Sequence, residues 1–264
     1  MKVLCLGFSY TGRALSWLAP VYFLSRSPED VRRAGYLTFP MDSPGLAIDM
    51  ILDCVPATGQ DLPYRPIVER ILQERPESRY VHISSTSVLP SGSGAPAEPV
   101  PTFDETSAPA PDEARGQARL NLENAVRTVY GPRVSILRSG GIYGPGRSLV
   151  ERFAREDFAR TGSGNRIVSR IHVADLARLA LKIGEAPEVL PLVHGVDLRS
   201  TPNREVFEYL EKRLGIHIPG NWRVESPTGR RVVSLTAGRL LGQYLFPDYR
   251  TGFEDCLRRS RLKF

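Results

Sequence analysis

Short apolar runs alternate with longer segments of helical periodicity along most of this chain. The run at 48–55 is largely apolar, which indicates a strand buried on both faces, as in a parallel sheet. Alternation of strands with helices predicts right-handed βαβ crossovers and a doubly wound α/β sheet. Strands are predicted at 3–6, 21–24, 48–55, 80–83, 133–137 and 192–196, with a short one from 168 that enters a helix running to about 183. Further helices are predicted from 13 and at 61–74, 114–130, 148–160 and 202–214.

The composition is that of an ordinary globular protein of 264 residues, with 41% hydrophobic and 24% charged residues. No apolar run is long enough to span a membrane and the N-terminal stretch has no cleavage signal, so we expect a cytoplasmic protein with no membrane partner. The net charge of +6 suits anionic ligands such as phosphates. Because that charge is spread out and no nucleic-acid-binding motif appears, we expect a small-molecule substrate and no nucleic acid, in a monomer or homodimer.

The cysteines do not predict a metal site. Cys5, Cys54 and Cys256 are widely spaced and form no metal-binding pattern, and their odd number argues against a disulfide framework. The first two lie in apolar runs, which is typical of buried thiols. No other cluster of metal-ligating residues appears, so no metal is predicted.

A glycine-containing turn follows the first apolar run. Gly7, Ser9 and Gly12 stand in the pattern G-x-S-x-x-G, between a predicted strand and a predicted helix. That layout places backbone N–H groups under a pyrophosphate, and the Ser9 hydroxyl can donate to a phosphate. Many strand-to-helix turns carry two glycines for packing alone, so both interpretations stay open. Tyr10 and Thr11 complete the predicted phosphate-binding turn.

The second apolar run predicts which nicotinamide cofactor would bind. It ends in Ser25, Arg26 and Ser27, where an acidic residue would bind the 2′-hydroxyl of an adenosine ribose. No acid is present, and Arg26 suits a 2′-phosphate, which favours NADP over NAD. The alternative is that Arg26 is a surface loop arginine.

Hydroxyl and glycine residues follow two later strands. Four hydroxyl residues at 84–87 follow the strand at 80–83, at the carboxyl edge where ligands bind in open α/β sheets. The turn at 138–147 carries more glycines than a simple connector needs. A segment at 89–111, rich in proline, serine, glycine and alanine, predicts a long loop over the site.

Together these motifs resemble the extended short-chain dehydrogenase/reductase superfamily, in its NAD-dependent epimerase/dehydratase branch. The matching pieces are the glycine turn, 82–88, 104–105, 137–146 and 170–175, and they cover about residues 1 to 215 in the family's order. The resemblance implies a Rossmann fold with a small C-terminal cap on the substrate side. It implies an NADP-binding domain at 1–197, in which 147–166 contributes to the cleft, and a smaller region at 198–264.

The resemblance also implies roles for single residues. Ser85 matches the catalytic Ser/Thr that hydrogen-bonds the substrate oxygen, although a strand-end serine can simply cap backbone. Arg147 and His172 would face the substrate cleft, where arginine can hold an anionic group, and His172 could equally be a satisfied buried histidine. The other implied contacts are Val55, Pro56, Ser84, Ser139, Gly140 and Ile142 with the cofactor and Thr86 with the substrate.

One departure from the family concerns the proton relay. Family members with the standard chemistry carry Y-x-x-x-K on the helix after the long loop, with the tyrosine as general acid/base. The match places Arg115 at the tyrosine and Arg119 at the lysine. Arg119 can still bind ribose hydroxyls or phosphate, but the Arg115 guanidinium stays protonated and cannot do the tyrosine's work. Tyr143 is a catalytic candidate by position only.

Two functions are therefore expected, and a third, a nucleotide-sugar-modifying enzyme, rests on analogy of fold alone and is disfavoured by the short C-terminal region. The first is an NADP(H)-binding oxidoreductase or epimerase-like enzyme that acts on a small, anionic carbonyl or alcohol compound without the Tyr-x-x-x-Lys motif. The second is a non-catalytic NADP(H)-binding sensor or scaffold. The intact glycine turn and strand-end serines favour the first, and the loss of the tyrosine and lysine favours the second.

Overall fold

A seven-stranded parallel sheet forms the centre of the molecule. The structure is a computed structural model that describes residues 1–264 apart from 42–45, 58–61, 93–98, 159–161, 224–226 and 260–264. The strands are β1 (Val3–Leu6), β2 (Val21–Leu24), β3 (Leu37–Thr38), β4 (Met50–Asp53), β5 (Arg79–Ser85), β7 (Val134–Ser139) and β11 (Leu192–Gly195). Their order is β11-β7-β5-β4-β1-β2-β3 and every pairing is parallel. This order confirms the predicted doubly wound Rossmann fold.

Helices cover both faces of the sheet. Neighbouring residues of a strand point to opposite faces, so Cys5 packs on one side and Leu4 on the other. The Cys5 face is covered by α1 (Tyr10–Leu15), α2 (Pro28–Arg33), α6 (Val173–Glu185) and α8 (Ala237–Leu241). The Leu4 face is covered by α3 (Arg65–Glu74) and α4 (Ala114–Tyr130). Both faces of the strands are therefore buried, as the largely apolar run at 48–55 predicts.

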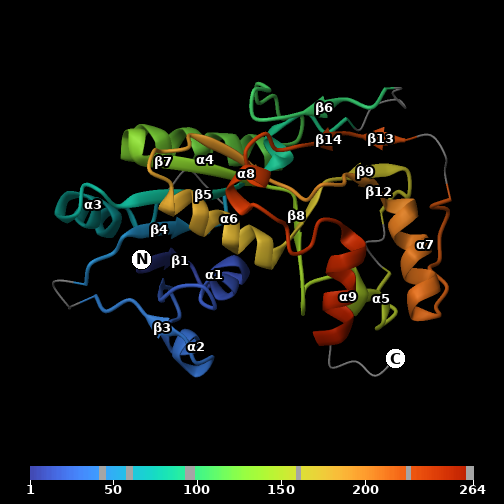
Figure 1. Ribbon diagram of the computed structural model, residues 1–264, viewed down its shortest axis with the longest axis horizontal. Helices are drawn as coiled ribbons and strands as arrows, with labels where there is room; N and C mark the ends of the chain where they lie inside the picture. The colour runs from blue at the N-terminus through green and yellow to red at the C-terminus, as the bar shows by residue number, and fades with distance from the viewer. Residues whose placement is uncertain (42–45, 58–61, 93–98, 159–161, 224–226, 260–264) are drawn as a thin grey trace.

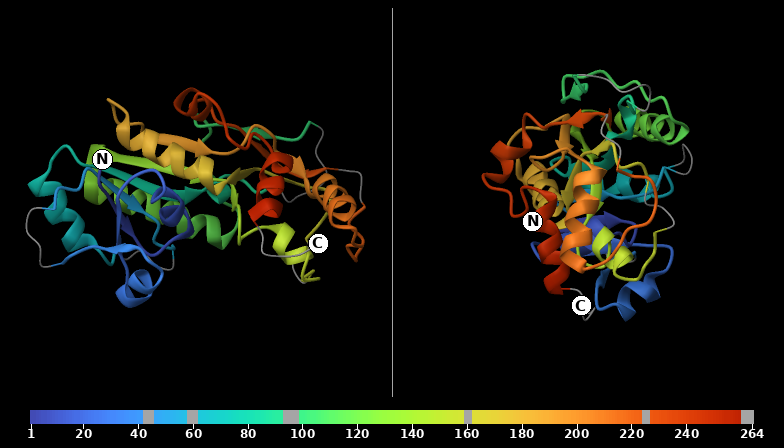
Figure 2. Two further views of the ribbon diagram at one scale, coloured as in Figure 1. Left: turned by 60° about the horizontal axis from the view of Figure 1, so that its bottom comes forward. Right: turned by 90° about the vertical axis from the view of Figure 1, so that its right-hand side faces the viewer.

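A separate apolar core lies at one end of the sheet. There α5 (Leu149–Phe153), α7 (Asn203–Leu214) and α9 (Tyr249–Arg259) gather, as Figures 1 and 2 show. Phe153, Phe207 and Phe253 form its centre together with Trp222, whose indole N–H donates to the Ile218 carbonyl at 2.9 Å. A small sheet beside it contains β9 (Arg166–Val168), β12 (Thr201–Pro202) and β13 (Thr228–Gly229).

Several elements differ from the sequence prediction. Within residues 148–158, the described part of the helix expected at 148–160, only α5 is helical, and the left-handed φ of 55° at Glu156 prevents regular helix from continuing; residues 159 and 160 lie outside the described residues. The helix expected at 61–74 begins at Arg65, with Pro66 in its first turn, while residue 61 lies outside the described residues. The segment at 89–111 contains a strand, β6 (Thr102–Phe103), that pairs with β14 (Arg231–Val232).

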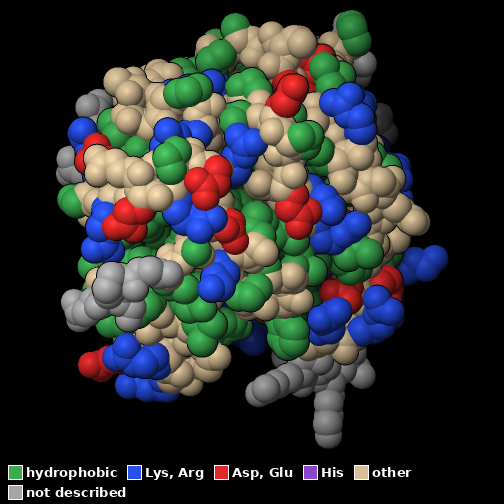
Figure 3. All heavy atoms as spheres, turned by 60° about the vertical axis from the view of Figure 1, so that its left-hand side comes forward, with side chains coloured by type: hydrophobic (Ala, Val, Ile, Leu, Met, Phe, Trp, Pro, Cys, Tyr) green, Lys and Arg blue, Asp and Glu red, His purple; other side chains and the backbone are tan. Residues whose placement is uncertain are grey.

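Charge is mixed over the surface. On the face shown in Figure 3, Lys and Arg side chains are interspersed with Asp and Glu side chains, so no single basic patch occupies that face. None of the helices in the described residues has the length and apolarity needed to cross a membrane.

Candidate functional site

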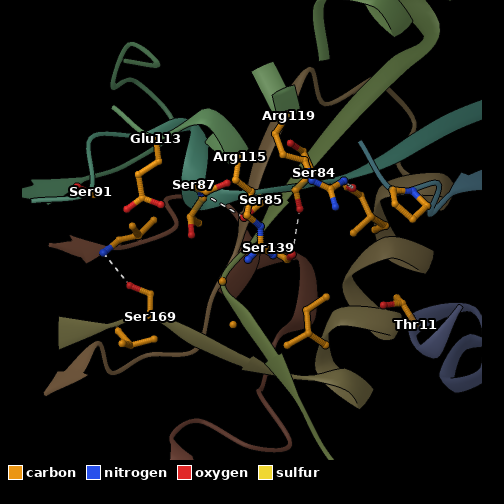
Figure 4. Close-up of a pocket in the computed structure, with 18 of the residues that line it drawn as sticks. Thr11, Ser84, Ser85, Ser87, Ser91, Glu113, Arg115, Arg119, Ser139 and Ser169 are labelled. Atoms are coloured by element: carbon orange, nitrogen blue, oxygen red, sulfur yellow. Dashed lines mark hydrogen bonds between the residues drawn. The ribbon is translucent and has the colours of Figure 1, made fainter. Parts of the chain in front are cut away.

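A cavity of about 590 Å³ opens at the carboxyl ends of the central strands. Its wall includes residues 9–11 after β1, residues 84–87 at the end of β5, and residues 139–142, which run from the end of β7 into β8 (Gly141–Tyr143). We call it the strand-end cavity. In Figure 4, Ser84, Ser85 and Ser139 occupy its middle, with Thr11 toward one side and Glu113 with Ser169 toward the other. The sequence motifs at 9–11, 84–87 and 139–142 thus meet in one place.

The glycine turn serves both packing and conformation. Gly7 has a φ of 87°, and a Cβ added there would meet no atom within 4 Å, so open space adjoins it. Gly12 is a packing glycine, because an added Cβ would lie 2.5 Å from the Cys5 sulfur. Ser9 caps α1, since its hydroxyl oxygen accepts the Gly12 N–H at 2.9 Å. The open side of Gly7 and the capped start of α1 fit the approach of a phosphate group.

A buried polar network holds the strand-end serines. The Ser84 hydroxyl donates to Glu123 Oε1 at 2.5 Å, and the Ser139 hydroxyl donates to the Ser84 carbonyl at 3.0 Å. Glu123 also accepts from Arg138, whose Nη2 lies 2.7 Å from Oε2. The sequence analysis missed this pair. A signal for it is present in the sequence: Glu123 lies on the apolar face of the predicted helix at 114–130, and Arg138 directly follows the predicted buried strand at 133–137. Two opposite charges at buried positions indicate an ion pair.

Ser85 caps backbone and also lines the strand-end cavity. Its hydroxyl oxygen accepts the Ser87 N–H at 3.1 Å and caps the short 3-10 helix η1 (Thr86–Val88). Its side chain also lines the strand-end cavity, beside Thr86. The cap uses an oxygen lone pair and leaves the hydroxyl hydrogen free of that bond, so Ser85 can donate to a ligand atom.

Arginines dominate the charge of the cavity wall. Arg115, Arg119 and Arg147 line it as expected. Arg230, for which the sequence favours a solvated role over contact with a ligand, lines it too, and so does Arg166, which the sequence analysis missed. The described lining contains one carboxylate, Glu113, whose Oε1 lies 4.0 Å from an Arg166 nitrogen. The Arg230 Nη2 donates to the Thr86 carbonyl at 2.8 Å, and its Nε is buried with no hydrogen-bond partner in the described residues. Such a wall favours anionic ligands.

Burial and like charge perturb Arg119. Its Nη1 donates to the Ile83 carbonyl at 3.5 Å, a long hydrogen bond that directs the side chain toward the end of β5. Burial and the charge of Arg115 lower the pKa of Arg119, while Asp53 and Glu123 oppose that shift.

No protein-family model matches the sequence, and no curated protein sequence matches it. Solved structures do. A putative NAD-dependent epimerase/dehydratase from Methylobacillus flagellatus is 25% identical over 97% of both chains, with a TM-score of 0.72. The human epimerase family protein SDR39U1, solved with NADPH, is 18% identical over 98% of this chain and all of that chain, with a TM-score of 0.72. MoeE5, solved with UDP-glucose and NAD, is 18% identical over 99% of both chains, also with a TM-score of 0.72.

The chain has the epimerase/dehydratase fold. The matches cover 97–99% of this chain, so they extend beyond the central sheet to the end that contains α5, α7 and α9. The fold implied by the resemblance is therefore confirmed.

Two residues expected in the cleft of this epimerase/dehydratase fold lie outside the strand-end cavity. Tyr143 lines a neighbouring cavity of about 610 Å³, and its hydroxyl donates to the Asp248 carbonyl at 3.2 Å. Burial raises its pKa, which makes it a poorer acid. The structure therefore does not bring Tyr143 together with Ser85, because the side chain packs into the apolar core of α5, α7 and α9, against Phe253.

His172 also points away from the strand-end cavity. It caps α6, with Nδ1 accepting the Ala174 N–H at 3.3 Å, and its ring centroid lies 3.9 Å from that of Phe246. Burial lowers its pKa to about 4 although Asp255 opposes the shift, so the ring is neutral at pH 7. It lines a third hollow together with Trp17. The ring is buried, as in the alternative, but its Nε2 makes no hydrogen bond in the described residues and lies 3.5 Å from Asp255 Oδ2, so it is not a fully satisfied histidine.

The remaining predicted contacts are divided between the strand-end cavity wall and positions outside it. Pro56 lines the wall, whereas the other predicted contacts are not part of it: Gly7, Gly12, Ser25, Arg26 and Val55. Arg26 is exposed at the end of β2, and the Ser25 hydroxyl oxygen accepts the Ser27 N–H at 3.2 Å. No group of three or more metal-ligating side chains is found in the described residues.

Proposed function

We propose that the chain binds NADP(H) across the strand-end cavity and acts on a small, anionic carbonyl or alcohol compound, as an oxidoreductase or an epimerase-like enzyme. The observation that supports this most directly is the convergence of the glycine turn, the strand-end serines and the 139–142 turn at the carboxyl edge of a parallel sheet. Open α/β sheets bind ligands there, beside the point where the strand order reverses. In this sheet that point adjoins β1 and β4.

The residues present suit the cofactor. The open side of Gly7 and the start of α1 would receive the pyrophosphate, and Arg26 would receive the 2′-phosphate. Pro56, Ser139 and Ile142 would border the nicotinamide ring. The human neighbour binds NADPH and MoeE5 binds NAD, so the choice of NADP rests on Arg26. When bound, the cofactor supplies hydride transfer.

The chain's own residues would orient the substrate. Ser85 would donate its hydroxyl hydrogen to the reacting oxygen, with Thr86 and Arg147 toward the rest of the molecule. Tyr10 is the one phenol among the described lining residues. Its hydroxyl donates to the Pro145 carbonyl at 2.9 Å and burial raises its pKa. The proton released or taken up would therefore pass through water.

A cofactor titration tests this proposal. We expect NADPH to bind more tightly than NADH, as measured by protein fluorescence. Arg26→Ala should weaken NADPH binding about 10-fold or more, because a charge-assisted contact is lost, and leave NADH unchanged. Arg32→Ala, an exposed arginine on α2, is the control for charge alone. If neither NADPH nor NADH binds, the proposal is refuted.

The second candidate is a non-catalytic NADP(H) sensor. It is favoured by Arg115 at the tyrosine position and by a described cavity lining that contains no histidine. A sensor would bind the cofactor tightly, turn over no substrate, and change its affinity for a partner protein with the redox state of the cofactor. Turnover of any carbonyl compound in a substrate panel would exclude this alternative.

A further inference from the structure

Arg115 lies in one corner of the strand-end cavity, and the side chains around this corner are hydrogen-bond donors. Arg115 and Arg119 are four residues apart on α4, on one face of the helix, and both line the cavity with Ser85 and Ser87. The Ser87 hydroxyl is buried and has no hydrogen-bond partner in the described residues. A ligand for this corner must therefore offer acceptors and negative charge.

Few acids offset the charge of this corner. Glu123 is paired with Arg138, and Glu113, which also lines the cavity two residues before Arg115, is half exposed and lies 4.0 Å from Arg166. Glu113 precedes α4 but makes no side-chain cap, so it leaves the first N–H groups of this 17-residue helix to other partners. The positive end of the helix adds to the two guanidinium charges.

Close packing fixes where Arg115 stands. A Cβ added to Gly116 would lie 2.1 Å from the Ser87 carbonyl oxygen, so the start of α4 presses directly on η1. Any residue other than glycine would push the helix away. This contact holds Arg115 beside Ser85 and Ser87. Figure 4 shows the three residues close together in the cavity wall.

We propose that Arg115, supported by Arg119 and the hydroxyls of Ser85 and Ser87, binds a carboxylate or phosphate group of the substrate at the position where the resembling family keeps its tyrosine. A guanidinium cannot exchange a proton at neutral pH, but its planar fork matches an anionic group with two oxygens. The electrostatic repulsion between the Arg115 and Arg119 guanidinium groups is reduced when that anion binds. This inference rests on the proposed function and narrows the substrate to a compound whose anionic group lies close to the reacting carbon.

Binding of simple anions tests the assignment. Malonate and inorganic phosphate are titrated into the full chain by calorimetry at low ionic strength, with and without saturating NADPH. Arg115→Ala should weaken binding of the preferred anion about 10- to 100-fold, because a charge-assisted contact is lost. Arg127→Ala removes the same charge from the same helix but lies outside the cavity wall, and it should bind as the wild type does. Thermal melting of each variant checks that it is folded.

The outcomes separate the two proposals. Anion binding lost in Arg115→Ala and kept in Arg127→Ala supports the site, and preference for malonate or phosphate identifies its chemistry. Equal loss in both variants, or no anion binding by the wild type, overturns it. If Arg115→Ala weakens NADPH binding as strongly as anion binding, the guanidinium serves a cofactor phosphate and the substrate assignment fails. If NADPH does not bind but malonate does, the proposed function fails while the anion site stands.

Discussion

The buried pair of Glu123 and Arg138 predicts a large and specific loss of stability when it is broken. The two residues are 1% and 3% exposed, and they join α4 to β7 directly behind the strand-end serines. Arg138 donates from Nε to both carboxylate oxygens, at 3.0 and 3.2 Å, and from Nη2 at 2.7 Å. Glu123→Gln would leave the guanidinium buried without a counter-charge. Losing one partner of such a pair costs about 3–5 kcal/mol.

Urea unfolding at pH 7 measures this loss. Glu123→Gln is expected near the lower end of that range, because the amide oxygen can still accept from Arg138 and Ser84. The double variant Glu123→Leu with Arg138→Met removes both charges and should recover most of the lost free energy of unfolding. Glu69→Gln breaks the exposed pair with Arg65 and is the control, with an expected change of at most about 1 kcal/mol.

The comparison can fail in a definite way. If Glu123→Gln costs no more than Glu69→Gln, the pair contributes little and the serines must be held by backbone pairing alone. If the double variant is less stable than Glu123→Gln, the unpaired charge is not the source of the cost. Either result would refute the reasoning from burial.

Two further predictions concern a buried acid and a close contact. Burial raises the pKa of Asp197 from 3.8 to about 8, although the hydrogen bond from the Arg199 N–H and the charge of Arg170 both lower it. The folded state therefore binds a proton that the unfolded state releases, and stability falls by a few kcal/mol as pH rises from about 4 to about 8. Asp197→Asn should flatten the melting temperature against pH, and parallel curves would contradict this. Gly116→Ala should lower the melting temperature although alanine favours helix, and an increase would show that α4 does not press on η1.

Much of the fold could be predicted because its signals are local. The largely apolar run at 48–55 contains β4, and the helix expected at 114–130 matches α4 at both ends. Each reflects burial of a regular element on the sheet, which apolar spacing reports directly. The end of α5 could not be predicted, because it depends on the left-handed backbone at Glu156 and not on periodicity.

The residues of the candidate site also fall into those that local sequence motifs predict and those that only tertiary packing brings in. The turns at 9–11, 84–87 and 139–142 each follow a strand in the sequence, so the order of motifs was enough to bring them together. Arg166 and Arg230 reach the cavity only because β13 pairs with β9, a contact between distant segments. The burial of His172 depends on Phe246, which comes from the tail. No local pattern around these residues reports such packing.

Charge at the tyrosine position bears on both candidate functions. The oxidised nicotinamide ring is a cation and the reduced ring is neutral, so under the proposed function the Arg115 guanidinium, close to the reacting carbon, would disfavour the oxidised cofactor. A sensor built this way would bind the reduced form preferentially, whatever else it contacts. An enzyme must accommodate both forms in one cycle, and an anionic substrate group held by Arg115 would offset the guanidinium charge while the oxidised ring is present. Under the proposed function, an arginine in place of the tyrosine would therefore make a substrate anion a requirement of the enzyme, but not of the sensor.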